Sequence, residues 1–358
     1  MNQRAFPTLG PLLVMAAIAF TCTSGCAGAK RTRQPASTSV HTNAASTTPT
    51  TTTAQPNPAE QPASFAALPW DFEGATGIQL TSQHHRLFTT GSTHWMREGV
   101  AAFCDVALLH YRTVFCELPE PPRPLDIYLF ADRPQWQRYT ELLMKEHAAV
   151  YLSLGRGGYT TRGTAVLYDL GYDDTFAMLS HEGWHQYTQV AFKHPLPTWL
   201  EEGIAAWMEG RQQSPGSPIV FDAWANPHRM FSLRRAARRD ALVPLIQLID
   251  RSPQHFLQRD DEGLLTYYAQ VWLLVHFLNE GEGGRYRDGL RRVLRDAANG
   301  RITSTVLTAL NASPPGERRR LATSQLGPGV ILTYFNSDLN AFALEYDAFV
   351  ADVLKRRR

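Results

Sequence analysis

The segment that most constrains this chain is His181-Glu182-Gly183-Trp184-His185, an H-E-x-x-H pattern. Residues four apart lie on the same face of an α-helix, so a helix here directs both imidazoles at a single point, with Glu182 beside it. Two imidazoles and one further carboxylate leave a fourth tetrahedral position around a zinc ion open for water. The pattern therefore predicts a helix that carries two zinc ligands, His181 and His185, and a general base, Glu182.

The residues before the pattern are typical of a helix start. Asp173, Asp174 and Thr175 provide N-cap and acidic first-turn chemistry. Apolar or small residues then follow at helical spacing, at Phe176, Leu179, Gly183 and Tyr187. The H-E-x-x-H pattern therefore lies on a credible helix.

The third ligand is one of two neighbouring glutamates, Glu201 and Glu202. Thr198 is a natural N-cap, and Glu201 stands three residues later, where it completes a capping box. Glu202 is then free to face inward with the small residues Ala205 and Ala206. The pattern favours Glu202 as the ligand, with Glu201 as the alternative.

These segments together resemble a known family. HEGWH followed by Trp199-Leu200-Glu201-Glu202-Gly203-Ile204-Ala205 is similar to the gluzincin metallopeptidases, the clan of thermolysin and the aminopeptidase N-like enzymes. In the aminopeptidase branch the matching segment reads W-L-x-E-G-x-A, and its Glu, which falls on Glu202 here, binds zinc. The resemblance implies a zincin-like fold, a Zn²⁺ cofactor and the hydrolysis of peptide bonds.

The resemblance also implies a donor for the oxyanion. The aminopeptidases have a downstream helix that begins with Tyr and has Leu ten residues later, and the stretch from Tyr268 to Leu278 has that form. Tyr268 is the match, with Tyr267 beside it, and an ordinary core tyrosine is the alternative. The G-x-M-E-N segment that captures a free amine in those enzymes has no counterpart in this sequence. Over residues 75–350 the chain is also similar to uncharacterised secreted bacterial H-E-x-x-H proteins of Planctomycete type.

The first 64 residues have the pattern of export followed by a tether. Residues 1–26 combine Arg4 with a short apolar run, too short to span a bilayer as a helix but typical of a signal peptide. Thr23-Ser24-Gly25-Cys26 resembles a lipobox, which predicts a lipid anchor at Cys26, with simple secretion as the alternative. The Ser-, Thr- and Pro-rich residues 27–64 predict a disordered linker. We therefore expect an extracytoplasmic protein of the cell envelope whose only membrane contact is that anchor.

Residues 65–358 predict one α+β catalytic domain. The chain is 44% apolar with a formal charge of +2, which is ordinary for a globular protein. We expect a mixed α/β part at 65–175, with a small mixed sheet, and an active-site and mainly helical part at 176–358. The expected elements are strands at 78–81, 125–130 and 165–168 and helices at 93–118 and 134–148. The segment 164–169 is either an edge strand on which a substrate peptide adds or an interior strand.

Two further patterns concern disulfide pairing and nucleic-acid binding. Cys104 and Cys116, if on one helix, are separated by about 18 Å of rise, too far for a disulfide, so both are expected to be buried free thiols. The four arginines within 234–239 are typical of a solvated helix face, and no nucleic-acid partner is expected.

The sequence thus predicts a zinc metallopeptidase that acts on a peptide or protein substrate. Glu182 is expected to be the general base on a zinc-bound water, and Tyr268 the second catalytic residue. The alternative is a non-catalytic, zinc-stabilised binding module at the cell surface.

Overall fold

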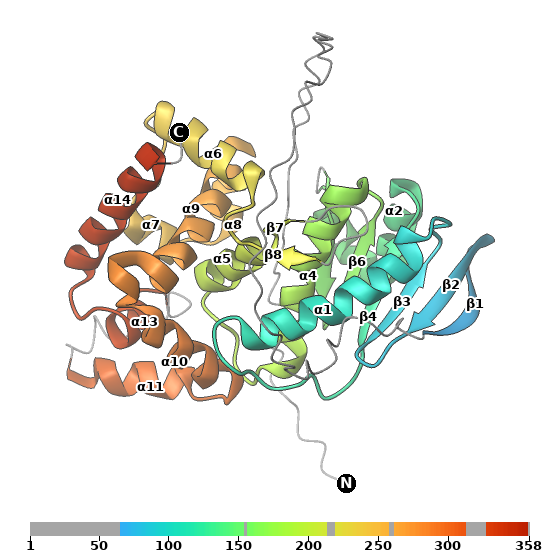
Figure 1. Ribbon diagram of the computed structural model, residues 1–358, viewed down its shortest axis with the longest axis horizontal. Helices are drawn as coiled ribbons and strands as arrows, with labels where there is room; N and C mark the ends of the chain where they lie inside the picture. The colour runs from blue at the N-terminus through green and yellow to red at the C-terminus, as the bar shows by residue number, and fades with distance from the viewer. Residues whose placement is uncertain (1–64, 154–155, 213–218, 258–260, 313–326, 357–358) are drawn as a thin grey trace, which may run out of the picture. The chain divides into compact units, whose positions relative to one another are not determined.

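A six-stranded mixed sheet stands before the HEGWH helix in the chain, and helices dominate after it (Figure 1). The computed structural model describes residues 65–153, 156–212, 219–257, 261–312 and 327–356. All of them belong to one compact unit of the chain, while a second unit, Phe20–Pro62, lies outside the described residues. The predicted signal peptide, the anchor at Cys26 and the linker at 27–64 also lie outside them.

The sheet has the strand order β1-β2-β3-β4-β6-β5. Its strands are β1 (Ala66–Phe72), β2 (Ala75–Thr81), β3 (His85–Thr89), β4 (Leu125–Phe130), β5 (Tyr159–Thr161) and β6 (Thr164–Tyr168). β3, β4 and β6 run parallel, and the other pairs are antiparallel. Parallel neighbours need crossover connections, and helices in the 95–152 region supply them. The three strands expected from the sequence are confirmed, and so is the α+β class.

Of the two alternatives for residues 164–169, the edge strand is wrong and the interior strand is confirmed. Residues 164–168 form β6, which lies between β4 and β5 and is therefore interior. The short strand β5, which the sequence pattern did not single out, is the last strand of the described sheet. The sequence could not show whether residues 164–168 lie at the edge or inside the sheet. That depends on the short strand β5, which folds back through a tight turn to pair with β6.

The helices before the HEGWH pattern follow the expected positions with breaks. They are the π-helix η2 (Trp95–Gly99), α1 (Val100–Thr113), α2 (Arg133–Met144), the 3₁₀-helix η3 (Lys145–His147) and α3 (Ala148–Leu152). The helix expected at 93–118 ends at Thr113, because the Leu118 amide turns back to the Arg112 carbonyl at 2.9 Å. The helix expected at 134–148 is broken at Lys145, whose φ is 50°. Cys104 and Cys116 are buried free thiols, as predicted, although the premise that both lie on one helix is wrong, because α1 ends before Cys116.

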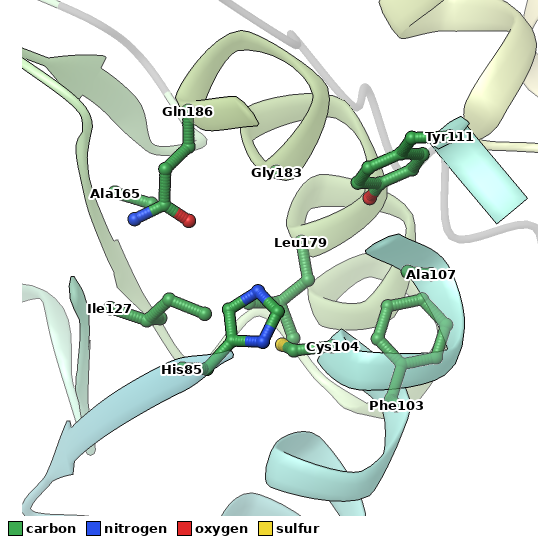
Figure 2. Close-up of a pocket in the computed structure, with 10 residues that line it drawn as sticks. All are labelled: His85, Phe103, Cys104, Ala107, Tyr111, Ile127, Ala165, Leu179, Gly183 and Gln186. Atoms are coloured by element: carbon green, nitrogen blue, oxygen red, sulfur yellow. The ribbon is translucent and has the colours of Figure 1, made fainter. Parts of the chain in front are cut away.

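The HEGWH helix, α4 (Tyr172–Ala191), is covered on two opposite sides. Leu179, Gly183 and Gln186 face α1 and the sheet, where they line a small cavity with His85 and Cys104 that has room for about one water molecule (Figure 2). A Cβ at Gly183 would lie 2.7 Å from the Tyr111 hydroxyl, so a glycine is needed for this close approach. His181 and His185 fall on the other side of the helix by its periodicity.

The remaining elements are a small hairpin and the later helices. They are α5 (Thr198–Met208), β7 (Arg211–Gln212), β8 (Val220–Phe221), α6 (Pro227–Arg238), α7 (Leu245–Asp250), α8 (Pro253–Leu257), α9 (Asp261–Glu280), η4 (Gly281–Gly284), α10 (Arg287–Ala298), α11 (Ile302–Ala309), η5 (Leu310–Ala312), α13 (Gly327–Tyr334) and α14 (Leu339–Arg356). None of the helices in the described ranges is long and apolar enough to cross a membrane. The expected loop at 214–218 lies outside the described residues.

A close helix contact brings α5 against α9. A Cβ at Gly203 on α5 would lie 2.6 Å from the Val271 carbonyl oxygen on α9, so the two backbones approach to a distance that only glycine permits. Glu202 precedes this contact on α5, and Tyr268 lies one turn before Val271 on α9. The glycine of the W-L-x-E-G-x-A segment therefore sets the spacing between the two helices that carry Glu202 and Tyr268.

We expect Gly203→Ala to lower the free energy of unfolding by about 1–3 kcal/mol through overpacking. Urea or thermal unfolding measures this loss. The matched control is Gly99→Ala, because a Cβ there would meet its nearest heavy atom at 3.5 Å and Gly99 has a helical φ of −61°. The control should keep or gain stability, since Ala favours a helix. An equal loss in both variants would contradict the close contact of α5 with α9.

Candidate metal centre

Three buried side chains from α4 and α5 converge on one point. The Nε2 atoms of His181 and His185 each lie 3.5 Å from Oε2 of Glu202. All three residues are fully buried, and their possible ligand atoms lie within 4.8 Å of one another. Within the described residues, this is the only group of three or more His, Cys, Asp or Glu side chains so arranged. The structure thus brings together the three predicted ligands.

The chemistry of this group fits a metal ion. Nε2 of both histidines and both carboxylate oxygens of Glu202 have no hydrogen-bond partner among the described residues. Buried polar atoms left without partners are costly, and a cation would satisfy all of them at once. Ligands about 2.0–2.1 Å from a tetrahedral ion lie about 3.3–3.4 Å apart, close to the two distances of 3.5 Å found here. The group can therefore hold a metal ion.

Carboxylates hold the opposite side of each imidazole. Nδ1 of His181 lies 2.7 Å from Oε1 of Glu209, and Nδ1 of His185 lies 3.0 Å from Oε1 of Glu201. With a carboxylate accepting from Nδ1–H, each ring presents the lone pair of Nε2 to the ion. This arrangement fixes the tautomer and orientation that metal binding needs.

The capping box expected at the start of α5 is wrong. α5 begins at Thr198 with Pro197 at the N-cap, and no side chain caps it. Glu201 accepts a hydrogen bond from the Thr188 hydroxyl at 2.6 Å and faces His185 instead. The buried imidazole N–H needs an acceptor, and this need outweighs capping at a helix end. Because Glu201 is engaged on the Nδ1 side of His185, Glu202 is the carboxylate that faces the ligand position, as the sequence favours.

Glu209 is a residue of the site that the sequence analysis missed. It follows α5 and is 6% exposed. Arg229 and Asn226 donate hydrogen bonds to its carboxylate. Burial would raise the pKa of Glu209, but Arg229 and His181 outweigh this effect and lower the pKa to about 2. The available signal was its spacing, because residues seven apart on a helix share a face and Glu209 comes seven residues after Glu202.

Glu182 has the environment of a proton carrier. It is fully buried, and neither of its carboxylate oxygens has a hydrogen-bond partner among the described residues. Burial raises the pKa of Glu182, although the nearby His185 and His181 oppose the shift. A carboxyl group whose pKa moves toward neutrality is suited to accept and then return a proton.

Tyr268 lies next to His181. Its ring is 6.1 Å from the His181 ring, centroid to centroid, and is fully buried. The pKa of Tyr268 is raised well above its usual value, mainly by burial. The charges of Glu202, Tyr267 and Glu182 also raise it. The neighbouring Tyr267 stacks on Phe256 at 4.9 Å, and its pKa is raised by burial and by Glu202. Of the two tyrosines, Tyr268 is the one in ring contact with a predicted ligand.

The charges of the group are arranged for a cation. Burial opposes the charged imidazolium, yet nearby carboxylates raise the pKa of both His181 and His185 in the metal-free protein. Burial likewise opposes the charge of Glu202, but the two histidines lower the pKa of Glu202 to about 2. The site therefore keeps a carboxylate that attracts positive charge, whether protons or a metal supply it.

Comparisons with protein-family models, with curated proteins and with solved structures found no match to this chain.

We expect zinc binding to release protons and the apparent zinc affinity to fall as the pH is lowered. The pKa of each imidazole is raised by nearby carboxylates, so the metal-free protein holds protons that zinc must displace up to a higher pH than free histidines would. Each displaced proton changes the apparent affinity by about tenfold per pH unit below the raised imidazole pKa values. Calorimetric titrations in buffers of different ionisation enthalpy measure both effects. A pH-independent affinity would show that zinc binds elsewhere.

The two neighbouring glutamates should behave differently when replaced. Glu202→Ala removes a ligand and is expected to abolish stoichiometric metal binding, whereas Glu201→Ala only frees the His185 ring and should weaken zinc affinity by about 10–100-fold. Elemental mass spectrometry after dialysis against a chelator separates these outcomes. Retained zinc in Glu202→Ala, with loss only in Glu201→Ala, would reverse the choice of ligand.

Proposed function

We propose that this protein is a zinc-dependent metallopeptidase of gluzincin type. One observation carries the proposal: the ligand atoms of His181, His185 and Glu202 face one another without hydrogen-bond partners among the described residues, while carboxylates hold the far side of both imidazoles. Two histidines and one carboxylate form a zinc set that leaves a position open for catalysis. A zincin-like fold and a place in the cell envelope belong to the same proposal.

Glu182 performs the proton transfers of the reaction. When bound, zinc supplies Lewis-acid polarisation and makes a water acidic near neutral pH. Glu182 takes a proton from the water that attacks the carbonyl carbon, and passes it to the amide nitrogen as the C–N bond breaks. Its buried, unpartnered carboxylate and raised pKa suit both steps. A site that only stabilises structure has no need of such a base.

Tyr268 stabilises the charge that develops on the carbonyl oxygen. Its pKa is raised, so the phenol keeps its proton at neutral pH and can donate a hydrogen bond. The contact of its ring with His181, at 6.1 Å between centroids, supports this role. A fixed donor in a buried site needs little reorganisation as the oxyanion forms.

The position of β5 supports an extended peptide as substrate. β5 is the last strand of the described sheet, and the Thr160 hydroxyl on β5 donates to the Glu182 carbonyl oxygen at 3.0 Å. A peptide that added to this edge as a further strand would run alongside the helix that carries the general base. We therefore propose peptides or unfolded protein segments as substrates.

The decisive variants are Glu182→Gln and Tyr268→Phe, tested on a quenched-fluorescence peptide library. Glu182→Gln should abolish measurable turnover with one zinc still bound, because it removes the base and no ligand; a base contributes about 10²–10⁴-fold. Tyr268→Phe should lower kcat by about 10²–10³-fold with little change in KM. Tyr267→Phe is the matched control and should remain near wild type, since the Tyr267 hydroxyl has no hydrogen-bond partner among the described residues.

The same experiment separates the alternative function. A wild-type protein that binds one zinc per chain but cleaves no member of the library would favour the zinc-stabilised binding module. A folded protein that binds no zinc would overturn the metal site as well.

A further inference from the structure

We propose that Arg229 on α6 is a positioning residue that holds both the predicted ligand His181 and the predicted oxyanion donor Tyr268. The proposal rests on the function proposed above. Arg229 lies on α6, outside both α4, which carries the H-E-x-x-H pattern, and α5, which carries Glu202.

Arg229 binds the carboxylate behind His181 with two donors. Its Nε donates to Oε2 of Glu209 at 2.9 Å and its Nη2 donates to Oε1 at 2.5 Å, and Oε1 is also the atom that faces Nδ1 of His181. Arg229 is 2% exposed, so the pair is shielded from water. A two-pronged contact of this kind fixes the plane of the carboxylate as well as its charge.

The same guanidinium also lies over the ring of Tyr268. The distance from Cζ of Arg229 to the ring centroid is 5.0 Å, within the range of a cation–π contact. Tyr268 in turn meets His181 edge to face, with an interplanar angle of 75°. One cation therefore touches the support of a metal ligand and the aromatic ring that carries the phenol.

The start of α6 fixes Arg229 in this place. Asn226 caps the helix by accepting from the Arg229 amide at 3.2 Å, and its Nδ2 donates to Oε2 of Glu209 at 2.8 Å and to the Ala206 carbonyl at 3.2 Å. The helix cap thus ties α6 to the end of α5. Because backbone and side chain are both held, Arg229 acts as a rigid support.

Removal of Arg229 would leave Glu209 as a buried carboxylate with less compensation. Such a group turns toward other donors, because an unpaired buried charge is costly. This change weakens the acceptor for Nδ1–H of His181 and loosens the ring that presents Nε2. The Tyr268 ring loses its cation at the same time. The expected defect therefore affects both metal affinity and the chemical step.

The test compares Arg229→Gln and Arg229→Lys with Arg235→Gln in the full chain. Arg235 lies on the same helix and pairs with Glu262 on α9, so its replacement removes an ion pair that holds α6 without touching the site. The readouts are zinc affinity by chelator competition, the visible absorption spectrum of the cobalt-substituted protein, kcat and KM, and the unfolding temperature.

We expect Arg229→Gln to weaken zinc affinity by about 10–100-fold and to alter the cobalt spectrum, with kcat falling more than KM changes. Arg229→Lys keeps the charge and lacks the planar fork, so it should recover part of the affinity. Arg235→Gln should lower only the unfolding temperature. If Arg229→Gln does not fold, Arg229→Lys carries the comparison, because it should still bind zinc more weakly than Arg235→Gln.

A double-mutant cycle with Tyr268→Phe tests the second contact. The loss in kcat caused by Tyr268→Phe should be smaller in the Arg229→Lys background than in wild type, because the phenol is already misplaced there. Additive losses would overturn the coupling to Tyr268. Zinc affinity and a cobalt spectrum equal to those of Arg235→Gln would overturn the support of His181.

The two proposals fail in different ways. A wild type that binds zinc but cleaves no peptide refutes the proposed hydrolysis, while the affinity and spectrum of the Arg229 variants still decide the support of His181. Hydrolysis by wild type, with unchanged zinc affinity in both Arg229 variants, refutes the role of Arg229 alone.

Discussion

Burial of charge between α4 and α5 is the constraint on which the site depends. His181, Glu182, His185 and Glu202 are all fully buried, and a group of this kind persists only where opposite charges or hydrogen bonds offset the loss of water. The surroundings supply this compensation on one side of each ring. Glu201 and Glu209 satisfy the two Nδ1 atoms, and the Nε2 atoms together with the Glu202 oxygens are left facing one another. A cation bound between these atoms would supply the partners that they lack.

Helix packing around α4 and α5 explains the glycines Gly183 and Gly203 within the two sequence motifs. Gly183 allows α1 to press its Tyr111 against α4, and Gly203 allows α9 to approach α5. A larger residue at Gly203 would separate α5 from α9, the two helices that carry Glu202 and Tyr268, and a larger residue at Gly183 would push α1 away from α4. The sheet contributes through Gln186, whose Nε2 donates to the Asp126 and Gly163 carbonyl oxygens. α1 and the sheet thus hold α4 on the side opposite His181 and His185.

The parts of the fold with strong local signals could be predicted from the sequence. β4 and β6 were expected to within a residue because their apolar runs are bounded by turn residues, and α4 was expected from its acidic first turn and its periodicity. The N-cap predicted within 173–175 is wrong, because α4 begins at Tyr172 with Gly171 at the N-cap and no side-chain cap. Features that depend on contacts between residues far apart in the sequence could not be predicted from it. The chain leaves α1 at Thr113 so that Phe115 packs on Trp207 at 4.8 Å, a contact between residues far apart in sequence. The role of Glu201 was missed for the same reason, since local capping rules do not include a buried imidazole from another helix.

The sequence by itself indicated which three side chains converge, because His181 and His185 share a helix face at a spacing of four and Glu202 lies in a segment with small neighbours. It also singled out Glu182, the proposed general base, which is adjacent to His181. Only the tertiary structure decided which groups support these residues: Glu209 and Arg229 behind His181, Glu201 behind His185, and Tyr268 beside them. The physical reason is that spacing along a helix is fixed by local geometry, whereas the partner of a buried charge is chosen by whichever distant element packs against it.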